Sequence, residues 1–485
     1  MRKLLLTYLI CFSGIPAFTQ ANWNNTSFVH RSGRQILDGN NTPIRLEGVN
    51  LGGWLLWEGW IWGSGYTQEK TIYNRIKNKV GQASADAFRD SVYHHFITRK
   101  DIEAISGECF NLVRLPFNHT ILEDDANPYV YKQSGWDLLD SVLDWCEDND
   151  LYVLFDMHSA PGGQSTYFVT DPDSPNMWAD PVYQTRTAEL WKAIANRYKN
   201  RGIVAGYDLL NEPVAPADST LVQFYELLVD SIRTVDTNHM LFIEGKDAST
   251  DFSIFTSLPD PNMVFAFHFY SWFVWNIPDA LDEYVALSQN MNVPVMCGEW
   301  GENNYAPLST TLDYFKDPAK QISGETFWTW KKMFSGGNYP CYVGVDTSSL
   351  WNKSIKWISN GFNPNPTVAE MQQGMNEFVQ NMKFQHCFFN DSMSDLLKAC
   401  SGTASLPENG EEFFQLIPNP ANKQVLIHAS FEPGTIRIYN PRGQLIESIT
   451  ISGTSYILDL SGYTNGIYFI CPERTAHAQK LVVHH

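Results

Sequence analysis

The chain has 485 residues, of which 44% are hydrophobic and 14% aromatic, with 16 Trp and a formal net charge of −19. This length allows about two to four domains, although single barrels can exceed 250 residues. The acidic balance argues against nucleic acids and anionic membranes as partners, because binding to either depends on clustered Lys and Arg. A neutral partner fits better, and the excess of Trp suits stacking on the faces of sugars.

Residues 1–19 are predicted to form a secretory signal peptide. Two basic residues precede an apolar stretch over residues 4–12, and small residues follow, so we expect cleavage just before Gln20. The apolar stretch is too short to span a bilayer. Cys11 follows a bulky residue, which makes a lipoprotein anchor the less favoured alternative. We therefore expect a secreted protein with no membrane anchor in the peptide chain. The sequence does not fix the oligomeric state, and a monomer is the expectation.

The cysteines and histidines give no metal-binding pattern. Cys387 and Cys400 are close enough in sequence for a local disulfide, which secretion permits. Neither CxxC nor HExxH occurs, and the adjacent His94 and His95 fall in a helix-like stretch where surface positions are expected. We predict no catalytic metal and no other cofactor.

Between residues 26 and 386, short strand-like runs alternate with longer helical patterns. The runs cover 44–54, 112–117, 151–158, 204–213, 240–245, 263–270, 293–301 and 326–331. Their near-continuous apolar character is typical of strands buried on both faces. Amphipathic helices lie between them, such as 220–232, with Asp218 or Ser219 as its expected cap. The pattern predicts an α/β fold, a (β/α)8 barrel. An open doubly wound sheet is the alternative, but no glycine-rich phosphate loop follows any strand.

The pattern changes after residue 386. Residues 387–411 contain "SGTASLPENG" and are predicted to be a linker. Residues 412–485 contain short alternating strands separated by Gly, Pro and Asn turns, which predicts a small all-β sandwich. This segment lacks an acidic pair, so we do not expect it to carry chemistry.

Every predicted barrel strand ends in polar or aromatic side chains. These are Asn50, Arg114, His158, Asn211 with Glu212, Glu244, His268 with Tyr270, Glu299 and Trp328. Strand ends converge on one face of a barrel, where the substrate site forms. Glu212 in "YDLLNEP" ends the fourth strand and Glu299 in "CGEWGE" the seventh, so the two carboxyls can face a common bond. Glycoside hydrolysis needs such a pair, one to protonate the leaving oxygen and one to attack the anomeric carbon or activate water.

With these motifs, residues 26–385 resemble glycoside hydrolase family five, a retaining branch of the barrel glycosidases. "NEP" and "GEW" are the most specific part of the resemblance, which runs through every barrel strand. It implies that Glu212 is the general acid/base and Glu299 the nucleophile, with Arg114 and Tyr270 hydrogen-bonded to the nucleophile. The implied substrate-binding residues are Asn211 at the sugar 2-hydroxyl, His158 and His268 along the subsite of the cleaved sugar, and Trp328 as its floor.

The substrate is less sharply defined. The segments 48–60, 156–164 and "FWTWK" are similar to the exo-β-1,3-glucanase and related β-glucanase branch of that family. There the glutamate that matches Glu58 contacts the terminal glucose, while the alternative is a polar loop residue beside a Trp cluster. Trp272, Trp275 and Trp300 are candidate sugar platforms, whereas Trp54 is expected in the core. We favour a β-1,3- or β-1,4-glucan as substrate, with β-mannan or another hemicellulose as the alternative substrate. The alternative to an enzyme is a non-catalytic sugar-binding barrel.

The C-terminal strands also have a likeness. Segments 414–427, 436–446 and 460–483 resemble the C-terminal sorting domain of the type IX secretion system of Bacteroidota. The resemblance implies a location outside the cell or at its surface, reached through the periplasm with the secretion machinery as partner. The chain departs from the pattern at Ile417, where an aromatic is commoner, and in its terminal His. A small carbohydrate-binding module is the alternative.

Overall fold

The computed structural model describes residues 28–399 except 175, 273 and 334–339, and residues 414–484 except 418–420, 430–433, 441–444, 452, 454 and 473–478. The predicted signal peptide and residues 400–411 of the predicted linker lie outside the described residues. The chain divides into two compact units, Met1–Cys400 and Ser401–His485.

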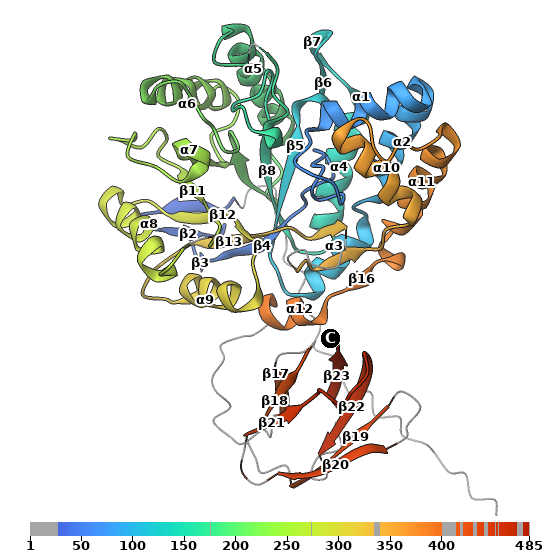
Figure 1. Cartoon of the computed structure of the whole chain (residues 1–485). Coiled ribbons are helices and arrows are strands. Elements are labelled where there is room, and N and C mark those ends of the chain that lie inside the picture. The colour runs from blue at the N-terminus through green and yellow to red at the C-terminus, as the bar shows by residue number, and fades with distance from the viewer. Residues whose placement is uncertain are drawn as a thin grey trace, which may run out of the picture. The chain divides into compact units, whose positions relative to one another are not determined.

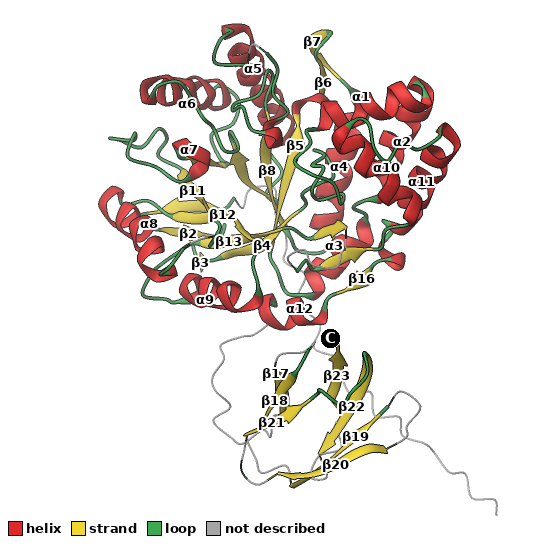
Figure 2. Cartoon of the chain, viewed as in Figure 1, coloured by secondary structure: helices red, strands yellow, loops and turns green. Residues whose placement is uncertain are grey.

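The first unit is a closed barrel of parallel strands surrounded by helices (Figures 1 and 2). In chain order its strands are β4 (Leu46–Asn50), β5 (Leu112–Asn118), β8 (Tyr152–Ser159), β9 (Val204–Asp208), β10 (Met240–Glu244), β11 (Met263–Phe269), β12 (Val295–Gly301) and β13 (Gly324–Trp328). Around the barrel they run β10-β11-β12-β13-β4-β5-β8-β9. Each of the eight predicted runs overlaps one of these strands, and their closed order confirms the barrel over the open sheet. The runs are apolar throughout because one face of each strand packs inside the barrel and the other against helices.

The remaining elements of the first unit form its outer layer and loops. The helices are α1 (Glu69–Val80), α2 (Gln82–His95), α3 (Arg99–Gly107), α4 (Gln133–Glu147), α5 (Pro181–Tyr198), α6 (Asp218–Arg233), α7 (Lys246–Ser249), α8 (Ile277–Met291), α9 (Tyr305–Lys316), α10 (Ser349–Asn360), α11 (Val368–Asn381) and α12 (Asp391–Leu397), with 3-10 turns η1 (His119–Ile121), η2 (Phe168–Thr170) and η3 (Phe384–His386). Small sheets contain β1 (His30–Ser32), β2 (Gln35–Leu37) and β3 (Pro43–Ile44); β6 (Glu123–Asp124) and β7 (Asn127–Tyr131); and β14 (Lys331–Met333), β15 (Val343–Val345) and β16 (Phe388–Phe389).

Local details of this layer correct one prediction and bear out another. The N-cap of α6 is Ala217, and no side chain caps it, so the predicted capping by Asp218 or Ser219 is wrong. The Asp218 carboxylate instead accepts a hydrogen bond from Lys246 Nζ at 3.1 Å. Trp54 is fully buried in the core, as predicted. None of the described helices has the length and apolar character of a membrane span.

The end of the barrel unit also differs from the prediction. Residues 388–397, predicted as linker, form β16, which pairs with β15, and α12. Cys387 is a free thiol, so the predicted disulfide with Cys400 is wrong. Its Sγ lies 3.4 Å from the backbone oxygens of Asn381 and Met382, at the end of α11. Cys109 is disulfide-bonded.

The second unit contains two antiparallel sheets, in agreement with the predicted sandwich. One has the order β17 (Phe414–Ile417), β18 (Gln424–Ala429), β21 (Ser455–Asp459), and the other β20 (Leu445–Ile451), β19 (Gly434–Tyr439), β22 (Gly466–Pro472), β23 (Gln479–Val483). Alternate residues such as Val425 and Ile427, and Ile436 and Ile438, are buried in one apolar cluster. This period of two is what a strand buried on one face requires.

Candidate active site

A cavity of about 490 Å³ opens among the loops that follow the barrel strands. The predicted site residues on its walls are Glu58, His158, Glu212, His268, Tyr270, Glu299 and Trp328. Arg114 and Asn211 are fully buried and contact these residues from within the barrel. The structure thus brings all nine predicted site residues together.

Glu299, on β12, has both carboxylate oxygens fixed by donors from other strands. Its Oε1 accepts a hydrogen bond from Arg114 Nη1 at 2.7 Å. Its Oε2 accepts one from the hydroxyl of Tyr270 at 2.8 Å. Arg114 belongs to β5, while Tyr270 directly follows β11. The carboxylate is therefore held in one orientation by two separate parts of the barrel, as the resemblance implied.

Glu212 follows β9 and is held at both its backbone and its side chain. Its φ of 47° lies in the left-handed region, which is strained for a residue with a side chain. The backbone N–H donates to Glu244 Oε2 at 2.7 Å, and the side-chain Oε1 lies 2.9 Å from His268 Nδ1. An oxygen of Glu212, an oxygen of Glu299 and a ring nitrogen of His268 all lie within 4.8 Å of one another. The two glutamates therefore face one small volume.

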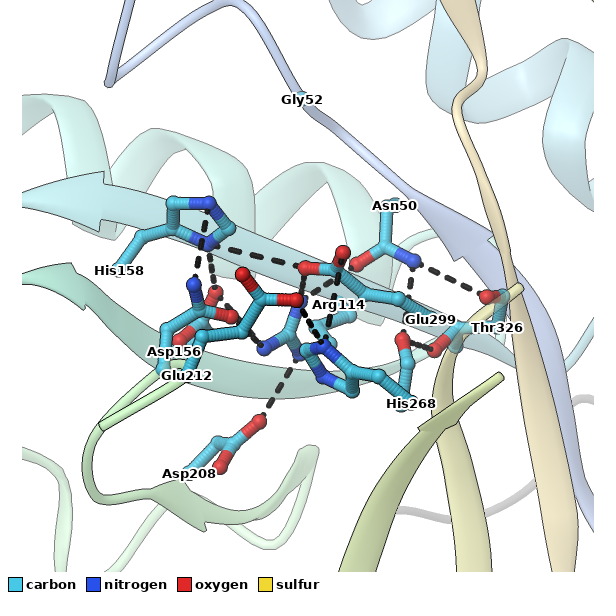
Figure 3. Close-up of polar contacts among 12 residues, drawn as sticks. Asn50, Gly52, Arg114, Asp156, His158, Asp208, Glu212, His268, Glu299 and Thr326 are labelled. Carbon is cyan, nitrogen blue, oxygen red and sulfur yellow. Dashed lines mark hydrogen bonds and ion pairs between the residues drawn. The ribbon is translucent and has the colours of Figure 1, made fainter. Parts of the chain in front are cut away.

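Arg114 is the centre of the polar network below this volume (Figure 3). Its guanidinium nitrogens lie 2.7 Å from Glu299 Oε1, 2.9 Å from Asp208 Oδ2, 3.1 Å from Asp156 Oδ2 and 3.2 Å from Glu244 Oε1. Asp156 and Asp208 were not predicted at the site, and Glu244 was predicted there only as one of the polar strand ends. The signal for the two aspartates was an acidic residue inside an otherwise apolar run, where an unpaired charge is unfavourable.

The ionisation states of this network follow from burial and from its two cations. Burial raises the pKa of Asp156 and of Asp208 well above the usual value, in spite of Arg114. Burial also opposes ionisation of Glu244, but the charges and hydrogen bonds of His268, together with Arg114, bring its pKa below the usual value. Burial opposes the charged form of His268, yet Glu244 and Glu299 raise its pKa well above the usual value. His268 Nε2 and Glu244 Oε1 lie 3.2 Å apart, and each favours the charged form of the other.

His158 forms one wall of the cavity together with Trp328. Burial lowers the pKa of His158 to about 4, so its ring is neutral at neutral pH. Asn211 Nδ2 donates to Nε2 at 3.4 Å, which leaves the proton on Nδ1, 2.7 Å from Asp156 Oδ2. The ring stacks on Trp328 at 5.3 Å between centres and 9° between planes. A Cβ on Gly52 would lie 2.8 Å from the Trp328 ring, so glycine is required there.

The predicted sugar platforms divide into accessible and buried side chains. Trp272 lines the cavity with 43% of its surface exposed, and Trp275 is fully exposed. Trp300 is only 2% exposed and packs against Phe315 and Phe327, so its prediction as a platform is wrong. Successive residues of a strand face opposite sides, and Trp300 therefore faces the helix layer when its neighbour on β12 faces the cavity.

Two overlapping groups of side chains have the donor types of a metal site. They are Asp156, His158 and Glu299, and Glu212, His268 and Glu299. Several of their donor atoms already bond to protein groups, including Glu299 Oε1 to Arg114 and His158 Nδ1 to Asp156. The absence of a catalytic metal stays a prediction.

The fold and the site define a class of protein, a (β/α)8 barrel with facing glutamates after its fourth and seventh strands. Residues 74–333, more than half of the chain, match the Cellulase (glycosyl hydrolase family 5) domain. The chain belongs to glycosyl hydrolase family 5. Residues 415–484 match the secretion system C-terminal sorting domain, which indicates secretion to the cell surface or beyond it.

Three relatives illustrate the similarity. A β-xylosidase of Phanerodontia chrysosporium is 34% identical over 265 residues, covering 54% of this chain and 55% of that protein. Endoglucanase C of Acetivibrio thermocellus is 30% identical over 248 residues, covering 51% and 63%. A probable glucan 1,3-β-glucosidase A of Aspergillus niger is 29% identical over 278 residues, covering 53% and 64%. The chain thus spans less than two thirds of each relative's length.

Proposed function

We propose that this protein is a secreted retaining β-glycosidase that hydrolyses β-linked glucose polymers or oligomers by double displacement. The observation that carries the proposal is the approach of Glu212 and Glu299, with carboxylate oxygens within 4.8 Å. Retaining glycosidases place their carboxyl groups about 5–5.5 Å apart, whereas inverting enzymes need about 6.5–9.5 Å to admit a water molecule. The short separation favours direct attack by one carboxylate.

In the first step, Glu299 attacks the anomeric carbon while Glu212 protonates the leaving oxygen. The bond to the leaving group breaks as a covalent glycosyl–Glu299 bond forms. Arg114 and Tyr270 aim the attacking carboxylate through hydrogen bonds of 2.7 and 2.8 Å. The hydrogen bond between His268 Nδ1 and Glu212 Oε1 leaves Glu212 Oε2 to carry the transferred proton.

In the second step, Glu212 acts as a base. It takes a proton from water, the water oxygen attacks the anomeric carbon, and the bond to Glu299 breaks to release the sugar with its original configuration. Asn211 is proposed to bind the sugar 2-hydroxyl, with His158 and Trp328 lining the subsite. The stacked rings of the last two give a flat apolar wall suited to one face of a sugar.

A neutral β-glucan is the substrate that the cavity supports best. Among the described residues, its lining combines aromatic side chains with carboxyl groups and includes no basic side chain other than histidine. An endoglucanase and a probable glucan 1,3-β-glucosidase are among the relatives, which favours glucose over mannose. The similarity to a β-xylosidase adds β-xylosides to the substrates to test. The sorting domain makes the type IX secretion machinery the proposed partner in export.

The function is tested with aryl β-glucosides, β-xylosides and β-mannosides and with laminarin, carboxymethyl cellulose, xylan and mannan. We expect glucosides and a glucan to be cleaved, with a β-configured first product by NMR. An α-configured first product would overturn retention, and no cleavage at all would favour the non-catalytic barrel.

Substrates with different leaving groups distinguish the roles of the two glutamates. Glu299→Gln is expected to lower kcat by several orders of magnitude on every substrate, since no covalent bond can form. Glu212→Gln should lose most activity on poor leaving groups but retain the first step on dinitrophenyl glycosides, which need no acid. Equal behaviour of the two variants on both substrates would refute the assigned roles.

A further inference from the structure

Two further carboxyl groups line the cavity outside the facing pair. Glu58 follows β4 and is 1% exposed, while Glu302 comes directly after β12. In the described part of the chain, Oε1 of each is buried and has no hydrogen-bond partner. A buried polar atom without a partner is unfavourable, so two such atoms in one cavity point to a ligand that completes their hydrogen bonds.

The barrel order places both carboxyls on the side opposite the acid/base. Strands β12, β13 and β4 are neighbours, and β13 lies four strands from β9 in either direction around the ring of eight. Glu212 follows β9 and protonates the leaving group in the proposed mechanism, so the leaving part of the substrate lies near β9. The arc from β12 to β4 therefore faces the sugar that stays bound to the nucleophile.

The carboxyl of Glu58 and the backbone of Glu302 are held by neighbouring side chains. Glu58 Oε2 accepts a hydrogen bond from Trp60 Nε1 at 2.7 Å. Lys332, only 5% exposed, places its Nζ 5.2 Å from the centre of the Trp60 ring. Trp272 Nε1 donates to the backbone oxygen of Glu302 at 2.8 Å, and Glu302 has a φ of 47° in the left-handed region. These contacts position Glu58 and Glu302 before a ligand binds. Such pre-organisation lowers the entropy cost of binding.

We propose that Glu302 hydrogen-bonds ring hydroxyls of a neutral sugar on the glycone side, beside Glu58, the sugar contact that the family resemblance already implied. The proposal rests on the proposed function in one respect, that the cavity holds a sugar. Burial raises the pKa of Glu58 well above the usual value and that of Glu302 to about 8. Below about pH 8 the protonated carboxyl of Glu302 can both donate and accept a hydrogen bond, as a sugar hydroxyl does.

The test measures binding and needs no turnover. In a Glu299→Gln background, titration with laminaribiose and cellobiose is followed by calorimetry and by Trp fluorescence. Adding Glu302→Ala is expected to raise Kd about ten- to a hundredfold, the loss of one or two hydrogen bonds. Glu302→Gln, which keeps a donor and an acceptor, should recover part of the affinity. Glu226→Gln, on the exposed face of α6, is the matched control and should leave Kd unchanged.

Each outcome decides the proposal. It is overturned if Kd for the double variant Glu299→Gln with Glu302→Ala lies within twofold of Kd for Glu299→Gln alone. It is also overturned if Glu299→Gln alone binds neither sugar. It is overturned as well if Glu302→Gln loses as much affinity as Glu302→Ala, because a donor and an acceptor at this position would then not be what binds the sugar. Failure of the proposed function would show instead as absent hydrolysis by the native protein, a separate measurement.

Discussion

The substitution Glu244→Gln tests whether the buried network positions the two glutamates. Glu244 accepts the backbone N–H of Glu212 at 2.7 Å and lies 3.2 Å from both Arg114 and His268. Glutamine keeps one oxygen for Glu212, but its amide group would place donors against two cations. The variant should therefore fold with lower stability and hold Glu212 less firmly.

The magnitude follows from the loss of a charge in a fully buried pair. Removing one partner of a buried ion pair costs about 3–5 kcal/mol of stability. If about 3 kcal/mol of this loss also destabilises the transition state, kcat/KM drops about a hundredfold, since 1.36 kcal/mol corresponds to a tenfold change in rate. We expect kcat to fall more than KM rises, because Glu244 is not on the cavity wall.

The assay is steady-state hydrolysis of the preferred aryl glycoside, with thermal unfolding of the same samples. Glu108→Gln is the matched control, a buried glutamate that accepts a hydrogen bond from Tyr342 away from the cavity. It should lose stability but keep kcat/KM. A folded Glu244→Gln protein with kcat/KM within threefold of wild type would refute the positioning role.

Further predictions concern pH, core packing and metals. Burial raises the pKa of Glu69 to about 8 from its usual 4.5. The folded protein therefore retains a proton that the unfolded chain loses, and the contribution of Glu69 to the free energy of unfolding falls as pH rises from about 4.5 to 8. The Tm of Glu69→Gln relative to wild type should therefore rise between pH 5 and pH 8; a difference independent of pH would contradict this. Trp300→Ala should lose about 3–5 kcal/mol of stability as a cavity in the core, whereas Trp275→Ala should stay within about 0.5 kcal/mol; equal unfolding free energies for the two would contradict their burial. Excess chelator should leave hydrolysis unchanged, and loss of activity restored by a divalent ion would show that a metal takes part.

The barrel could be predicted from the sequence because its strands are buried on both faces. Such strands are near-continuous apolar runs, and their ends meet at one face whatever the loops do. Glu212 and Glu299 were found by this reasoning, since a carboxylate at the end of an apolar run has few structural uses. Trp300 was predicted as a platform from its place beside Glu299, but successive residues of a strand face opposite sides and its ring is buried.

The network around Arg114 could not be assembled from the sequence. Asp156, Asp208 and Glu244 lie on three different strands, and only the tilt and register of the closed barrel bring them to one guanidinium. The role of Glu302 was missed for a different reason. Among the described residues its buried Oε1 has no hydrogen-bond partner, which is a property of the folded cavity and has no counterpart in sequence spacing.

The guanidinium of Arg114 touches acids from four other barrel strands, so chemistry and assembly depend on the same side chain. A mutational screen scored by activity alone would report its variants as inactive when many are simply not folded. Redesign toward another sugar therefore cannot treat all cavity residues alike. We expect the buried network around Arg114 to tolerate almost no substitution. Substitutions are better placed at Glu58 and Glu302, which lie on loops after the barrel strands and do not contribute to closing the barrel.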